Sequence, residues 1–253
     1  MLDLHVHLIG HQDRQADETA VRGFLQVAIE KGLVEIGFAD HDLYFGELDL
    51  PLLREVGKSY PGLKVRVGLE VDYRPGEEEK IQGVLERFPF DYVIGSVHEI
   101  EGWAFDSPGE EARHRAQDPD VLYGRYFSLV EKAARSGLFT TLGHLDLLKI
   151  YGVRPQKDIL ELADRALTAA EEMGLAIEIN TNGRYKPVGE FYPEPKLLQE
   201  AVFRGISVTL GSDAHEAKVV GRDLGEAMAL LHHLGAKKVV GFQGREPIAY
   251  SLI

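Results

Sequence analysis

The chain has 253 residues, a formal net charge of −13 and no cysteine. A surface this acidic argues against binding to nucleic acid or to anionic membranes through overall charge, and the absence of cysteine excludes disulfides and cysteine-ligated zinc. The start of the chain lacks the pattern of a signal peptide, and no apolar run is long enough to span a bilayer, so we expect a cytoplasmic protein.

Short apolar runs rich in β-branched residues alternate with amphipathic stretches in the first part of the chain. This alternation predicts repeated βα units around a parallel sheet. The predicted strands cover residues 2–7, 34–39, 65–71 and 92–97. The predicted helices cover residues 19–31 and an acidic stretch that ends near Phe88.

A polar, aperiodic stretch interrupts this pattern at residues 99–119, and we interpret it as a long loop over one face. Beyond it, helices are predicted at residues 120–136, 160–173, 196–204 and 225–234, and strands at residues 139–142, 175–179 and 206–210. A second long loop covers residues 180–195, and residues 238–242 form either an eighth strand or an outlying one. Because no Ser- or Pro-rich linker divides the chain, residues 1–253 are predicted to form a single α/β barrel domain.

Histidines and carboxylates, with one asparagine, stand at or just after the ends of the predicted strands. The set is His5, His7, His41, Glu70, His98, His144, Asn180, Asp213 and His215. In a parallel barrel the carboxyl ends of all strands lie on one face, where the loops build the active site. Residues spread over most of the chain are therefore predicted to meet in one pocket.

The spacing of these residues favours a metal cluster. Side chains at positions i and i+2 of a strand project from the same face, so His5 and His7 can bind one ion or two adjacent ions, as can Asp213 and His215. Imidazole and carboxylate together suit zinc, iron or manganese better than magnesium or calcium. The number of ligands is too large for one ion and implies two or three.

Other features of the sequence carry no comparable signal. His114 and the pair His232-His233 lie on a predicted loop and at a helix end, where a histidine is more often structural or solvated. No glycine-rich loop has the spacing of a nucleotide-binding motif, and no Gly-x-Ser-x-Gly sequence occurs. The candidate metal cluster is therefore the main functional signal.

On these residues the chain resembles the polymerase and histidinol phosphatase (PHP) superfamily along nearly its whole length. The matching motifs are His5-Val6-His7 with the later Gly10-His11, then Asp40-His41, then His144, then Asp213-Ala214-His215, with Glu70 and His98 between them. The resemblance implies a distorted TIM-like barrel of seven βα units that holds three metal ions. The nine ligands that it implies are His5, His7, His11, His41, Glu70, His98, His144, Asp213 and His215.

Within the superfamily the chain is most similar to the histidinol-phosphate phosphatases. The similarity lies in residues 90–98 with the later Trp103 and Asp106, in residues 143–146 with Lys149 and Tyr151-Gly152, and in Asn180-Thr181-x-Gly with the basic residues that follow. It implies a phosphomonoesterase that hydrolyses L-histidinol phosphate in histidine biosynthesis. A hydroxide that bridges two ions would attack phosphorus. The residues expected to bind the ions that carry this hydroxide are His5, His7, Glu70, His98 and Asp213.

The substrate contacts are predicted from the two long loops and the segment after the fifth strand. Arg154, Arg184 and Lys186 are expected to bind the phosphate, unless they are plain surface bases. Trp103 is expected to stack on the imidazole of histidinol, unless it only pins the loop to the barrel. Asp106 is expected to pair with the ammonium group of histidinol.

Two other functions stay open at this point. A different phosphoesterase of the superfamily would act on another phosphate ester or as an exonuclease, although the acidic charge argues against a nuclease. A non-catalytic metal-binding regulatory domain is the second, and the complete set of ligands argues against it. The expected partner is a small-molecule phosphate ester, with no nucleic acid and no membrane, and the oligomeric state stays open.

Overall fold

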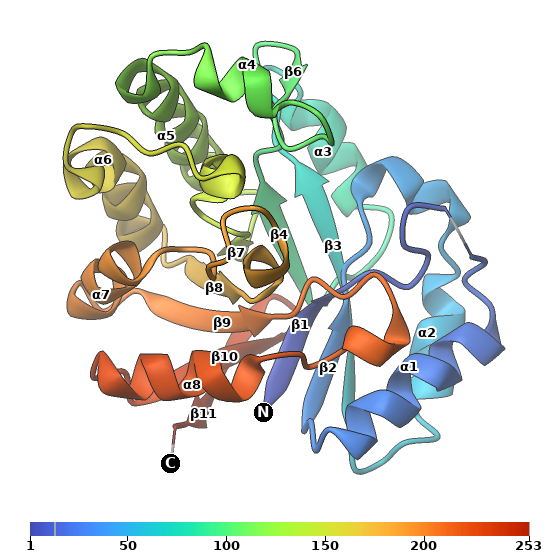
Figure 1. Cartoon of the computed structure of the whole chain (residues 1–253). Helices are drawn as coiled ribbons and strands as arrows, with labels where there is room; N and C mark the ends of the chain where they lie inside the picture. Colours follow the sequence, from blue (N-terminus) through green and yellow to red (C-terminus); the bar gives the residue numbers. More distant parts are fainter. Residues whose placement is uncertain (13, 253) are drawn as a thin grey trace.

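The computed structural model describes residues 1–12 and 14–252. Within these ranges seven parallel strands form one sheet in the order β1-β2-β3-β4-β7-β8-β9, with helices around it (Figure 1). The strands are β1 (Leu2–Val6), β2 (Glu35–Phe38), β3 (Lys64–Asp72), β4 (Tyr92–Ser96), β7 (Thr141–Leu142), β8 (Ala176–Asn180) and β9 (Ser207–Gly211). The predicted TIM-like α/β barrel is therefore confirmed.

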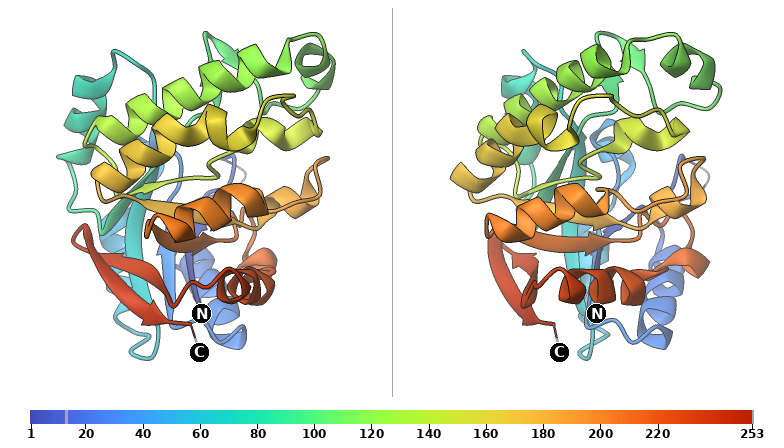
Figure 2. Two further views of the ribbon diagram at one scale, coloured as in Figure 1. Left: turned by 90° about the vertical axis from the view of Figure 1, so that its left-hand side faces the viewer. Right: turned by 60° about the vertical axis from the view of Figure 1, so that its left-hand side comes forward.

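The main helices lie on the outside of the barrel, where Figure 2 shows α5 and α6 side by side. They are α1 (Glu18–Glu30), α2 (Leu50–Gly57), α3 (Glu78–Leu85), α5 (Pro119–Arg135), α6 (Ile159–Glu172), α7 (Pro195–Phe203) and α8 (Leu224–His233). None of the helices in residues 1–12 and 14–252 has the length and apolar character needed to cross a membrane.

Helix α1 shows why these segments fold as they do. The carboxylate of Asp17 accepts a hydrogen bond from Ala20 N at 2.8 Å, which satisfies one of the free amides at the start of the helix. One face packs on the sheet, because the buried residues recur every three or four positions. They are Val21, Phe24, Leu25 and Ala28.

Hydrogen bonds between the end of β1 and the segment that follows β9 join the two edges of the sheet near its carboxyl end. His7 N donates to Ala214 O at 2.9 Å, and Ala214 N donates to His5 O at 3.2 Å. The end of β1 and the segment after β9 are therefore adjacent, although they come from opposite ends of the chain. This contact places His5 and His7 beside Asp213 and His215.

Tyr92, the first residue of β4, fills part of the barrel interior. Its side chain is fully buried, and its hydroxyl donates to Leu4 O at 2.7 Å. Gly37 on β2 and Gly68 on β3 leave space for the ring. A Cβ at Gly68 would lie 2.3 Å from Cζ of Tyr92, and a Cβ at Gly37 would lie 2.2 Å from its hydroxyl oxygen. The close packing of the interior therefore requires glycine at both positions.

A hairpin of β10 (Lys238–Gln243) and β11 (Glu246–Ser251) covers the amino-terminal end of the barrel, outside the parallel sheet (Figure 2). Arg245 N donates to Asp91 O at 2.8 Å, and the hydroxyl of Tyr250 contacts Glu35 and Lys64. The outlying position expected as one alternative for residues 238–242 is therefore confirmed, and the alternative of an eighth barrel strand is wrong.

Several short elements were not predicted, because they are too short to show a periodic pattern. The segment 99–119, expected to be a loop, contains a small hairpin and one helical turn: β5 (Glu99–Ile100), β6 (Trp103–Ala104) and α4 (Glu111–Arg115). Helix α2 between β2 and β3 was also missed. The same holds for the 3₁₀ segments η1 (Asp42–Glu47), η2 (Leu147–Tyr151), η3 (Asn182–Tyr185) and η4 (Ala217–Val219).

Candidate metal centre

The carboxyl ends of the barrel strands bring nine histidine and carboxylate side chains together. A cavity of about 280 Å³ opens at this end, and its walls include His11, His41, Glu70, His98, His144, Asp213 and His215. His5 and His7 are fully buried and lie against Glu70. All nine residues that the sequence and the resemblance pointed to as ligands are therefore neighbours in the structure.

Glu70 lies at the centre of this group, and both of its oxygens face imidazole nitrogens. Oε2 lies 3.2 Å from His5 Nε2 and 3.1 Å from His41 Nδ1. Oε1 lies 3.0 Å from His144 Nε2 and 3.6 Å from His98 Nε2. Burial disfavours a charge on this carboxylate, but the surrounding imidazoles hold the pKa of Glu70 well below its usual value. An ionised carboxylate in this position is suited to bridging two cations.

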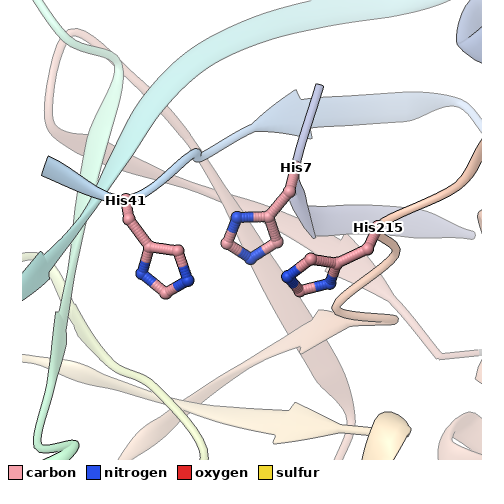
Figure 3. Close-up of side chains that lie close together, drawn as sticks. All are labelled: His7, His41 and His215. Carbon is pink, nitrogen blue, oxygen red and sulfur yellow. The ribbon is translucent and has the colours of Figure 1, made fainter. Parts of the chain in front are cut away.

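The candidate ligands form three overlapping groups, in each of which the ligand atoms lie within 4.8 Å of one another. The groups are His7, His41 and His215; His5, His7 and Glu70; and His41, Glu70 and His98. Figure 3 shows the three rings of the first group side by side, carried by separate segments of the chain. Because the groups share members, ions bound to them would be close neighbours, as in a polynuclear cluster.

The polar atoms of this centre fit a cation between them. His7 Nε2 lies 3.3 Å from Asp213 Oδ1 and 3.5 Å from Glu70 Oε2, yet neither ring nitrogen of His7 makes a hydrogen bond within the described residues. Burial and the neighbouring His215 lower the pKa of His7 well below its usual value, so the ring is neutral. Buried nitrogen and oxygen acceptors that face one another are costly, and a divalent ion bound to both removes that cost. This donor set fits zinc, iron or manganese.

Two carboxylates behind the centre, of Glu178 and Asp72, fix the orientation of two of its histidines. His5 Nδ1 donates to Glu178 Oε1 at 2.7 Å, and His98 Nδ1 donates to Asp72 Oδ1 at 2.5 Å. In both rings Nε2 is therefore the atom directed to the centre, as is usual for metal-binding histidines. Burial lowers the pKa of His98, but the carboxylates of Asp72, Glu70 and Asp106 together outweigh burial and raise this pKa to about 10. The site thus favours positive charge here, from a proton or from a metal ion.

Sequence reasoning did not predict Glu178, Asp72 or Ser96 as part of the site, although the hydroxyl of Ser96 donates to Glu70 Oε1 at 2.7 Å. A signal for all three exists in the sequence. Each lies two positions from a residue that was singled out, in the pairs Glu178 and Asn180, Asp72 and Glu70, and Ser96 and His98. Because alternate residues of a strand point to the same face, a spacing of two identifies them.

Asp213 is held in place by two asparagines. Asn180 Nδ2 and Asn182 Nδ2 lie 3.3 Å and 3.2 Å from Asp213 Oδ2, which leaves Oδ1 facing His7. The φ of Asp213 is +52°, in the left-handed region. This conformation costs a residue with a side chain about 1 kcal/mol or more, although aspartate tolerates it better than most. The surrounding hydrogen bonds therefore stabilise the carboxylate in a strained position.

Of the five predicted substrate contacts, Asp106 and Lys186 line the metal cavity. Lys186 makes no ion pair within residues 1–12 and 14–252. Its charge acts on the centre, since burial lowers the pKa of His11 and the nearby positive charges of His215, His41 and Lys186 lower it further. The structure thus places both residues at the cavity, and their contacts to phosphate and to ammonium stay predictions.

Trp103 does not line the cavity. Its side chain is buried within the segment 99–119, where Nε1 donates to Glu110 Oε2 at 2.6 Å and the ring packs against His114. These contacts lie within the segment itself, so neither stacking on a substrate ring nor the alternative of pinning the loop to the barrel describes the position of Trp103. His114 is buried on α4, and its Nε2 contacts Phe105 O at 2.8 Å, which is the structural role expected for it.

Arg154 and Arg184 also lie outside the metal cavity. Both line a separate hollow of about 600 Å³, and within the described residues its walls contain none of the nine candidate ligands. Arg154 pairs with Glu190 at 2.7 Å, and Arg184 pairs with Glu226 at 2.5 Å. Their guanidinium groups are held by carboxylates away from the centre, so of the three predicted phosphate-binding residues the structure brings only Lys186 to the cavity.

Comparison with known proteins agrees with this geometry. The model of the PHP domain family matches residues 3–182. A Deinococcus radiodurans protein described as a "probable histidinol-phosphatase" is 39% identical over 250 residues, which cover 93% of this chain and 94% of that protein. The crystal structure of histidinol phosphate phosphatase from Lactococcus lactis, complexed with zinc, L-histidinol and phosphate, matches with a TM-score of 0.78 at 25% identity and covers 98% of both chains. The chain therefore belongs to the PHP domain family.

Proposed function

We propose that this protein is a cytoplasmic histidinol-phosphatase, which hydrolyses L-histidinol phosphate to L-histidinol and phosphate in histidine biosynthesis. The observation that carries the proposal is the centre around Glu70, with its three overlapping groups of histidine and carboxylate ligands at the carboxyl end of the barrel. The similar enzyme from Lactococcus lactis, whose structure contains zinc, L-histidinol and phosphate, supports the same chemistry here.

We infer that the centre binds three divalent ions, of zinc, iron or manganese. When bound, such ions neutralise charge on the phosphoryl oxygens and lower the pKa of a coordinated water, so that hydroxide is available near neutral pH. The nine residues proposed to bind them are His5, His7, His11, His41, Glu70, His98, His144, Asp213 and His215. Of these, His5, His7, Glu70, His98 and Asp213 are proposed to hold the reacting ions. His5, His7 and His98 face the carboxylate of Glu70, and Asp213 faces His7.

The protein itself supplies orientation. Glu178 and Asp72 keep the Nε2 atoms of His5 and His98 directed to the centre. Because this arrangement exists before the substrate binds, it does not have to be assembled during the reaction.

The remaining cavity residues match the rest of the substrate. Lys186, which has no ion pair among the residues that the structure describes, supplies a positive charge for the phosphate, and Asp106 supplies a carboxylate for the ammonium group. Leu147 and Ile150 form an apolar part of the wall, next to which the carbon chain and imidazole of histidinol would lie. Groups that contact only the histidinol part allow the enzyme to discriminate between phosphate esters.

A phosphate-release assay with a panel of esters tests the proposal. L-Histidinol phosphate should be hydrolysed with a much higher kcat/KM than a plain alkyl phosphate, by up to about 10⁴-fold, and Asp106→Ala should lower kcat/KM for L-histidinol phosphate alone. Equal efficiency on both esters would indicate a general phosphoesterase, and release of nucleotides from an oligonucleotide would indicate an exonuclease. Metal binding without hydrolysis of any ester would indicate a regulatory domain.

A further inference from the structure

Tyr192 lines the metal cavity, and none of the roles described so far involves it. The residue is 1% exposed, and its hydroxyl has no hydrogen-bond partner within the described part of the chain. Buried tyrosine hydroxyls are usually paired, because an unpaired buried polar group is costly. A hydroxyl left unpaired in the wall of a binding cavity is therefore a candidate for contact with a ligand.

The ring of Tyr192 is held in a fixed position. Its backbone N and O exchange hydrogen bonds with those of Asn180, at 3.0 Å and 2.7 Å. Lys149 Nζ lies 5.3 Å from the ring centroid, and this fully buried lysine is itself held by Asp146 at 3.0 Å. Gly183 leaves room for the ring, since a Cβ there would lie 2.7 Å from Tyr192 Cε2. The hydroxyl is therefore in place before any ligand binds, which lowers the cost of binding.

The surroundings of Tyr192 indicate what it contacts. Its ring centroid lies 6.5 Å from that of His144, so the residue borders the metal centre. A tyrosine hydroxyl keeps its proton at neutral pH and can donate it in a hydrogen bond. A ligand that uses this donor has to present an acceptor oxygen close to the candidate metal ligands.

We propose that the hydroxyl of Tyr192 donates a hydrogen bond to a phosphoryl oxygen of the bound substrate and of the product phosphate. The inference rests on the proposed function only in requiring a phosphate at the metal centre, and it does not depend on which alcohol the ester carries. A neutral donor in this position adds directional binding to the positive charge of the ions and of Lys186. Tyr192 is thus a substrate-binding residue in addition to Lys186 and Asp106.

Binding of inorganic phosphate to the zinc-loaded protein, measured by isothermal titration calorimetry, tests this inference in Tyr192→Phe, which removes only the hydroxyl. Loss of a hydrogen bond to a charged group should raise the Kd of phosphate by about 10- to 100-fold. The Tm of the metal-free variant should equal or exceed that of the wild type, because an unpaired buried polar group has been removed.

Tyr123→Phe is the matched control. The hydroxyl of Tyr123 is also buried, but it donates to Val153 O at 2.8 Å. Removing it leaves a backbone oxygen unpaired, so this variant should lower Tm by about 2–4 °C. Its Kd for phosphate should equal that of the wild type.

Three results overturn the inference. One is an unchanged Kd for phosphate in Tyr192→Phe. The second is a weaker Kd together with a fall in Tm like that of Tyr123→Phe, since the hydroxyl would then stabilise the fold. The third is normal phosphate binding with weakened binding of L-histidinol alone, since the contact would then be to the alcohol. A wild-type protein that binds no phosphate removes the proposed function as well, so that failure is distinguishable from the other three.

Discussion

Replacing Glu178 by glutamine tests whether this buried carboxylate orients a metal ligand. Glu178 Oε1 accepts a hydrogen bond from His5 Nδ1 at 2.7 Å, and Oε2 accepts one from His144 N at 2.9 Å. Burial disfavours a positive charge on His5, but Glu178 and Glu70 raise the pKa of His5 well above its usual value. The carboxylate therefore stabilises a positive charge on this ring from one side while Nε2 faces the centre on the other.

A glutamine at this position has the same shape but only one acceptor oxygen. If its amide nitrogen faces His144 N, two donors meet and that hydrogen bond is lost. If the nitrogen faces His5 instead, the ring has to move its proton from Nδ1 to Nε2, and Nε2 can then no longer bind a metal ion. Removal of such a partner typically weakens metal affinity by about 10- to 100-fold, which corresponds to about 1.4–2.8 kcal/mol.

The assay is a zinc titration against a competing chelator, followed by phosphate release at saturating zinc. Glu131→Gln is the matched control, because Glu131 is also a buried glutamate but lies on α5, where it pairs with Arg135 and Arg165. That control should bind zinc as the wild type does. A zinc Kd for Glu178→Gln equal to that of the wild type, or an equal loss in Glu131→Gln, would show that Glu178 does not act through His5.

Three further outcomes are expected. Removal of metal by EDTA should abolish phosphate release and lower Tm, because ions that bind only the folded state stabilise it. Elemental analysis after reconstitution should find three ions per chain. Fewer than two ions per chain would contradict the proposed polynuclear metal centre. Gly68→Ala should lower the free energy of unfolding, measured by urea denaturation, by about 2–3 kcal/mol, because the added methyl group overlaps with Tyr92. Gly23→Ala is the control, because a Cβ there meets nothing within 4 Å. It should raise the free energy of unfolding by about 0.5–1 kcal/mol. Steady-state kinetics should show that Lys186→Ala raises KM for every phosphate ester by about tenfold, and that Arg184→Ala does not; the reverse would mean that the arginine moves into the cavity.

Much of the fold was predictable because its signals are local. The helix predicted at residues 19–31 is observed as Glu18–Glu30, and the strand predicted at residues 92–97 is observed as Tyr92–Ser96. Apolar residues at helical or strand spacing determine such elements within a short stretch of chain. The 3₁₀ segments and α4 are too short to show helical periodicity, and β5 and β6 lie in a polar stretch without an apolar run, so these elements were missed.

The candidate ligands were predictable for a related reason. A residue at the end of a parallel barrel strand lies at the carboxyl end of the barrel whatever its neighbours are, so its place in the sequence nearly determines its place in space. Loop residues have no such constraint. Arg154 and Arg184 come after the expected strands in the sequence, but their side chains form ion pairs with nearby glutamates. Trp103 packs against other residues of its own segment.

By itself, therefore, the sequence determined the alternation of strands and helices and the set of side chains that the strand ends carry. Only the tertiary structure decided the contacts between distant residues: which carboxylate orients His5, which ring requires Gly68 and Gly183, and which lysine lines the cavity. The physical reason is the distance along the chain over which each kind of interaction acts. Periodicity acts over a few neighbouring residues, whereas hydrogen bonds and close packing depend on atoms that the closed barrel brings together from opposite ends of the chain.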